Sequence, residues 1–143
     1  MKTYLNRQIR DLSNVSLYEE DYYLWLETTG QQLQQRDLEN LDWEHLREEI
    51  EALGNEQKHK VESYLLQLLK HLLFYQYWSV PDSKNHWGVE IDNFRVQLKR
   101  LLRSRSLYNY LLSVLEETYI DAARQARKKS GLTCFPQIGR AHV

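Results

Sequence analysis

Residues 56–78, EQKHKVESYLLQLLKHLLFYQYW, are the most apolar stretch of the chain and decide its fold class. If this stretch is a helix, apolar side chains cover well over half of its circumference. The apolar positions that recur at helical spacing are Val61, Tyr64, Leu65, Leu68, Leu69, Leu72, Leu73 and Tyr75. A helix that is apolar on nearly all sides belongs at the centre of a bundle. The stretch therefore predicts a central helix, which Pro81 would end.

Four other stretches repeat apolar residues every three to four positions and predict helices around the central one. They are residues 16–35, 42–53, 86–103 and 106–129. Ser16 and Glu19 have the spacing of a capping box, and Asp42 suits the N-cap of the second helix. Asn85 is expected to cap the helix after Pro81, and Gly131 suits the position after a last turn.

The helix over residues 42–53 is expected to bury one apolar stripe. The stripe consists of Trp43, Leu46, Ile50 and Leu53. Gly54 and Asn55 follow it and predict either a stop or a kink into the central helix.

These helices predict an all-α fold: a single-domain bundle of about five helices with short loops. No stretch alternates polar and apolar residues for long, and no hairpin signal occurs. The length of 143 residues suits one domain. The expected organisation is an N-terminal extension over residues 1–15, a bundle domain over 16–136 and a non-native-looking tail over 137–143.

Composition and charge exclude several classes of protein. The formal net charge is −1, which argues against a generally basic nucleic-acid binder. Residues 1–72 nevertheless carry a net charge of −6 and residues 73–143 a net charge of +5. The apolar runs are too short for a membrane span, and the amino terminus lacks the apolar region of a signal peptide. Since the single cysteine, Cys134, cannot form an internal disulfide, we expect a cytoplasmic protein.

A set of short motifs in a fixed order carries a family resemblance. The motifs are Tyr18-Glu19-Glu20-Asp21-Tyr22-x-x-Trp25, Leu41-Asp42-x-x-His45-Leu46-x-Glu48-Glu49-Ile50-Glu51-x-Leu53-Gly54, His71-Leu72-Leu73-x-x-x-Tyr77, Trp87-x-x-x-Ile91-x-x-x-Arg95, Tyr119-x-x-Ala122 and Gly131-Leu132-x-x-Phe135-Pro136. In this combination the chain resembles the bacterial family called domain of unknown function 29. The resemblance implies a small helical bundle and implies no chemistry.

The chain departs from this family pattern at three places. Phe74 stands where the family usually has lysine, which would place an aromatic ring on a polar face. Arg105 stands where the family often has proline, so the turn before the last helix is expected to be looser. The segment 138–143, IGRAHV, resembles the translation of a common sequencing-adapter DNA and is expected to be an artefact.

The outer face of the helix over 42–53 is the main candidate site. Glu44, Glu48 and Glu51 fall within roughly 60° of one another, on the side away from the apolar stripe. Three interpretations stay open: a solvated face, a partner surface, or a metal site with His45, Glu48 and Glu49 as weak candidate ligands. The acids that a di-iron bundle needs on two further helices are absent.

Two other polar residues border apolar faces. Arg95 is expected to reach an acid of the helix over 42–53, Glu49 or Glu48, across the bundle as a structural ion pair. His71 is expected to be a core histidine satisfied by one hydrogen bond. Nucleophilic catalysis has little support, because Cys134 does not begin a helix and no nucleophile elbow or phosphate-binding loop occurs.

The leading functional hypothesis is a non-catalytic protein–protein interaction module without a cofactor. It binds a protein partner or a second copy of itself through the acidic face and surplus exposed aromatic residues, among them Tyr23, Phe74 and Trp78. The first alternative is a nucleic-acid-associated regulator, half of a toxin–antitoxin-like pair, which rests on basic clusters near residues 99–105 and 124–129. The second alternative is a metal-dependent enzyme that uses His45 and the neighbouring acids.

Overall fold

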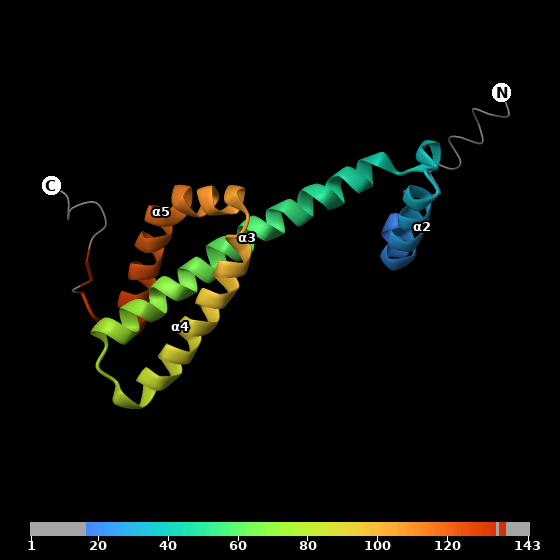
Figure 1. Cartoon of the computed structure of the whole chain (residues 1–143). Helices are drawn as coiled ribbons and strands as arrows, with labels where there is room; N and C mark the ends of the chain where they lie inside the picture. Colours follow the sequence, from blue (N-terminus) through green and yellow to red (C-terminus); the bar gives the residue numbers. More distant parts are fainter. Residues whose placement is uncertain (1–16, 134, 137–143) are drawn as a thin grey trace, which may run out of the picture. The chain divides into compact units, whose positions relative to one another are not determined.

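A computed structural model describes residues 17–133 and 135–136 of the chain (Figure 1). Helices account for nearly all of this part, and no strand occurs in it, which confirms the all-α prediction. Residues 17–20 are helical and are followed by α2 (Tyr22–Gln34), the short 3-10 helix η1 (Leu38–Asn40), α3 (Trp43–Tyr77), α4 (Pro81–Leu101) and α5 (Arg105–Ser130). The predictions for Ser16, Cys134 and the segments 1–15 and 137–143 lie outside the described residues.

The chain divides into two compact units, Met1–Gly54 and Asn55–Val143. In the described part, the first unit contains residues 17–20, α2, η1 and the start of α3. The second unit contains the rest of α3 together with α4 and α5.

Of the two alternatives for Gly54 and Asn55, the stop is wrong, because α3 is helical through both residues. Only Gly131 among the described glycines has a positive φ, so Gly54 lacks the left-handed conformation that ends a helix. A glycine inside a helix costs about 1 kcal/mol relative to alanine, and the good helix formers on both sides of Gly54 outweigh that cost. The expected N-cap is confirmed: Asp42 Oδ1 accepts a hydrogen bond from the His45 amide at 3.3 Å.

The expected start of the next helix is also wrong by several residues. α4 begins at Pro81, not near Asn85. Proline fits the first position of a helix, because its missing N–H would have no partner there and its φ is already helical. Pro81 therefore starts α4, and α3 has already ended at Tyr77.

Regular caps begin and end α5. Ser104 is its N-cap and accepts a hydrogen bond from the Leu107 amide at 3.3 Å, so the turn before Arg105 is well formed rather than loose. At the other end Gly131 adopts a φ of 74°, and its amide donates to the Arg127 carbonyl, as the sequence predicted.

In the second unit α4 and α5 flank α3 (Figure 1). Two apolar clusters fill the space between the helices. One consists of Leu73, Phe74, Trp87, Ala123, Ala126 and Phe135, and the other of Val61, Leu65, Leu98 and Leu111. The small alanines of α5 permit its close approach to the large aromatic rings.

Phe74 corrects a further prediction. It was expected to be exposed, yet it is 1% exposed and its ring centroid lies 5.6 Å from that of Trp87. Helices pack on both sides of this part of α3, so the apolar surface that the structure buries is wider than a single stripe. Trp78 is half-buried and packs against the same cluster, with Lys129 over the Phe74 ring at 5.5 Å.

Candidate functional site

The first unit packs through the polar face of α3. Tyr18 donates a hydrogen bond to Glu49 Oε1 at 2.5 Å, and Tyr22 donates to Glu49 Oε2 at 2.6 Å. Both oxygens of the Glu49 carboxylate therefore accept hydrogen bonds from tyrosines that lie at, or just before, the start of α2. Glu49, in the first turns of α3, thus connects α3 to residues 18–22 of the same unit.

A second acid on the same face binds two further rings. Asp42 Oδ2 lies 2.6 Å from His45 Nδ1 and accepts a hydrogen bond from Trp25 Nε1 at 3.2 Å. Trp25 is 2% exposed. The Tyr18 ring stacks on His45, with ring centroids 3.9 Å apart, and meets Trp25 edge-on. Aromatic stacking and partly buried hydrogen bonds together hold these side chains in place.

The hydrogen bonds shift the acidity of the groups that share them. Bonding to Tyr18 and then Tyr22 holds the pKa of the Glu49 carboxyl below its usual value. The same hydrogen bond, with loss of hydration and the Glu49 charge, raises the pKa of Tyr18 to about 12. Ionised Glu49 and neutral tyrosine are thus the forms that this packing favours.

The apolar stripe of the same helix segment lies beside the face that packs, not within it. Trp43 is 57% exposed, Ile50 63% and Leu53 60%, while Leu46 is half-buried. The prediction that these residues form a buried stripe is therefore wrong. At about 100° per residue, the centre of the stripe lies roughly 90° around the helix from the face that packs.

The acidic residues predicted from sequence form a third face of this segment. Glu44, Glu48 and Glu51 are exposed, roughly 150° around the helix from the centre of the stripe. Glu51 accepts a hydrogen bond from Arg47 at 2.9 Å. Residues 17–54 carry eleven acids and two bases, a net charge of −9.

Sequence reasoning missed the contacts of Tyr18, Tyr22, Trp25 and Asp42. Their spacing indicated an apolar helix face and an N-cap, which are local roles. The signal available was the concentration of tyrosine, tryptophan and acid in the family motifs. That concentration does not say which ring meets which carboxylate, because the partners are 17–31 residues apart.

The metal hypothesis finds no ligand set in the described part of the chain, where no group of three His, Cys, Asp or Glu residues could hold an ion. Among its candidates, Glu49 is bound by two phenols and Glu48 lies on another face. The predicted Glu49–Arg95 pair joins residues of different units and stays a prediction. His71 does satisfy one ring nitrogen, donating from Nδ1 to the Gln67 carbonyl at 2.7 Å, and burial lowers its pKa.

Fold and site define an all-helical protein whose acidic first unit presents an apolar helix face to its surroundings. The chain belongs to the family described as domain of unknown function DUF29, whose family model matches residues 17–141. The resemblance seen in the sequence motifs is thereby confirmed. No curated protein and no solved structure matches the chain. Within the described residues, no helix has the length and apolarity that crossing a membrane requires.

Proposed function

We propose that the chain is a protein-interaction module whose docking surface is the exposed apolar face of α3 in the first unit. Four residues define this docking face: Leu38, Trp43, Ile50 and Leu53. The observation that carries the proposal is the orientation of α3, which packs through Asp42 and Glu49 and leaves the docking face exposed.

The exposed apolar side chains of the docking face are neighbours on the surface, not isolated residues. Trp43, Ile50 and Leu53 follow one another on a single side of the helix. Leu38 is 50% exposed and adjoins Trp43, whose Nε1 donates to the Leu38 carbonyl at 3.2 Å. Burying the exposed half of each such side chain would stabilise a complex by on the order of 1 kcal/mol. Contiguous exposed apolar surface of this kind is typical of interaction sites.

Charge indicates the chemistry of the partner. A net charge of −9 over residues 17–54 attracts cationic surfaces and repels anionic ones. A second copy docking through the same face would bring two such units together, which electrostatic repulsion opposes. We therefore assign the docking face to an amphipathic helix of another protein, with an apolar stripe flanked by lysine or arginine.

A titration of the whole chain with a synthetic probe tests the proposal. The probe is a four-turn amphipathic helix of leucine and lysine only, and its counterpart replaces each lysine by glutamate. We expect the lysine probe to bind and Ile50→Glu to weaken binding at least about tenfold, since a charge then stands in the apolar stripe. Calorimetry measures both affinities.

The matched control is Ile120→Glu, which adds the same charge at a residue of the second unit that is 56% exposed. Because Ile50→Glu increases the attraction for a cationic probe, a loss of binding must come from the apolar contact. Equal binding of both probes, equal effects of both substitutions, or dimerisation through Ile50 would each overturn the proposal.

A further inference from the structure

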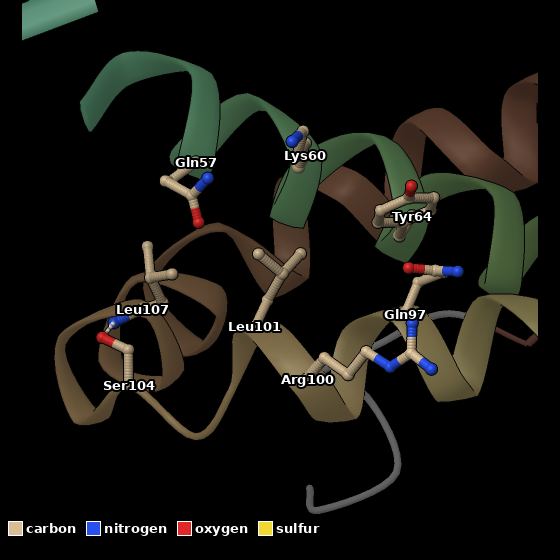
Figure 2. A pocket seen from close by; sticks show the side chains of 8 residues that line it. All are labelled: Gln57, Lys60, Tyr64, Gln97, Arg100, Leu101, Ser104 and Leu107. Carbon is tan, nitrogen blue, oxygen red and sulfur yellow. Dashed lines mark hydrogen bonds between the residues drawn. The ribbon is translucent and has the colours of Figure 1, made fainter. Parts of the chain in front are cut away.

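A cavity of about 330 Å³ opens in the second unit, between the middle of α3, the end of α4 and the start of α5 (Figure 2). Eight residues line it: Gln57, Lys60, Tyr64, Gln97, Arg100, Leu101, Ser104 and Leu107. Its volume lies at the lower end of the range typical of small-molecule sites. It is separate from the docking face, which belongs to the first unit.

The lining combines an apolar base with polar groups around it. Leu101 and Leu107 are half-buried side chains of the second apolar cluster, and Figure 2 shows Leu101 in the middle of the lining residues. The polar groups come from α3 on one side and α4 on the other, with Lys60 and Arg100 as the two cations. Such a site suits a ligand with an apolar body and a charged end.

Among the described residues, no carboxylate lines this cavity, although the chain contains 20 acids. A second cavity of about 280 Å³ in the same unit has the opposite character, with Glu62, Glu117 and Asp121 among its lining residues. The two cavities therefore differ in the sign of their charge. The cavity with Lys60 and Arg100 attracts anions.

Several of its donors are available to a ligand. Within the described part of the chain, the Arg100 guanidinium has no ion-pair partner and the Tyr64 hydroxyl has no hydrogen bond. Lys60 is paired with Glu56 at 3.3 Å, but both side chains are about half exposed. An exposed pair of this kind contributes only a few tenths of a kcal/mol, so an anion can replace it. Ser104 already caps α5 and contributes shape.

We propose that this cavity binds a small organic anion. The carboxylate or phosphate end lies against Arg100 and Lys60, because a guanidinium fork matches the oxygens of both groups. The apolar body covers Leu101, Leu107 and the Tyr64 ring. An aromatic acid or a small phosphate monoester has the required size and charge.

Nitrogen–proton correlation spectra of the full chain test this site, with benzoate, phenyl phosphate and the neutral analogue benzamide as probes. We expect the two anions to shift the amide signals of residues around the cavity and benzamide to bind at least about tenfold more weakly, as expected for losing a charged hydrogen bond. The tighter of the two anions identifies the preferred end group.

The variant Arg100→Gln is expected to weaken anion binding about tenfold, and Lys60→Gln by a smaller factor, because Lys60 is about half exposed and already paired with Glu56. Lys99→Gln and Arg103→Gln are the matched controls, because both residues are exposed near the end of α4 and do not line the cavity. Benzamide binding as tightly as benzoate, Lys99→Gln as damaging as Arg100→Gln, or no shifts with millimolar anions would overturn the assignment.

Discussion

Glu49 connects the two parts of the first unit, because its carboxylate accepts a hydrogen bond from a phenol at each oxygen. The sign of the linkage with pH follows from the two shifts. The lowered pKa of Glu49 stabilises the fold above the carboxyl's usual pKa of 4.5, and this contribution is lost as pH falls through the lowered value. The raised pKa of Tyr18 stabilises the fold below pH 10, and that contribution is lost as pH rises from 10 to about 12.

The Tyr18 phenol is therefore expected to ionise about two pH units later than an ordinary tyrosine. Ultraviolet absorbance of tyrosinate measures this, as the difference between the titrations of the natural chain and Tyr18→Phe. Tyr23→Phe is the control, since Tyr23 is 70% exposed and adjoins the same segment. A Tyr18 difference curve centred near pH 10 would contradict the short hydrogen bond to Glu49.

Phe74 contributes to stability by filling the aromatic cluster of the second unit. Phe74→Ala is expected to lower the free energy of unfolding by about 3–5 kcal/mol, because it leaves a cavity beside the stacked rings of Trp78 and Trp87. Urea denaturation of the full chain measures the change. Tyr75→Ala, at a neighbouring residue that is 45% exposed, should cost much less, and equal losses would count against the burial of Phe74.

Among the elements, α3 shows how far spacing alone predicts structure. The apolar pattern predicted that residues 42–53 and 56–78 are helical and that Asp42 caps the first of them. It did not predict which face of 42–53 packs. Helical spacing places Trp43 on one side and Glu49 on another, and does not say which side another segment covers. The choice depends on tyrosines that approach from another segment. The predicted exposure of Phe74 was wrong for a related reason, since residues on other helices decide whether its ring is buried.

Because α3 is continuous through Gly54, replacing this glycine by alanine should stabilise the helix. Gly54→Ala is expected to raise the free energy of unfolding by about 0.5–1 kcal/mol, because Gly54 is helical and an added Cβ would meet no atom within 4 Å. Gly131→Ala is the matched opposite: its φ of 74° makes any side chain unfavourable, so the substitution should destabilise. Thermal unfolding measures both. Destabilisation by Gly54→Ala would indicate that the helix does break there.

At the scale of the whole molecule, two units of opposite charge divide the functions proposed here. The acids at 44, 48 and 51 could be placed on an outer helix face from sequence. The docking face could not, because helical spacing marks apolar residues without showing whether anything covers them. The cavity around Arg100 joins residues from 57 to 107, and only the folded arrangement of three helices brings them together.

The central claim is that the exposed face of α3 binds a protein. Its most direct test is capture from a lysate of the source organism, with the natural chain, Ile50→Glu and Ile120→Glu as baits at low and high salt. The account predicts one basic protein in stoichiometric amount, retained by the natural chain and by Ile120→Glu and lost from Ile50→Glu, with weaker retention at high salt. The same proteins on all three baits, or none on any, would contradict it.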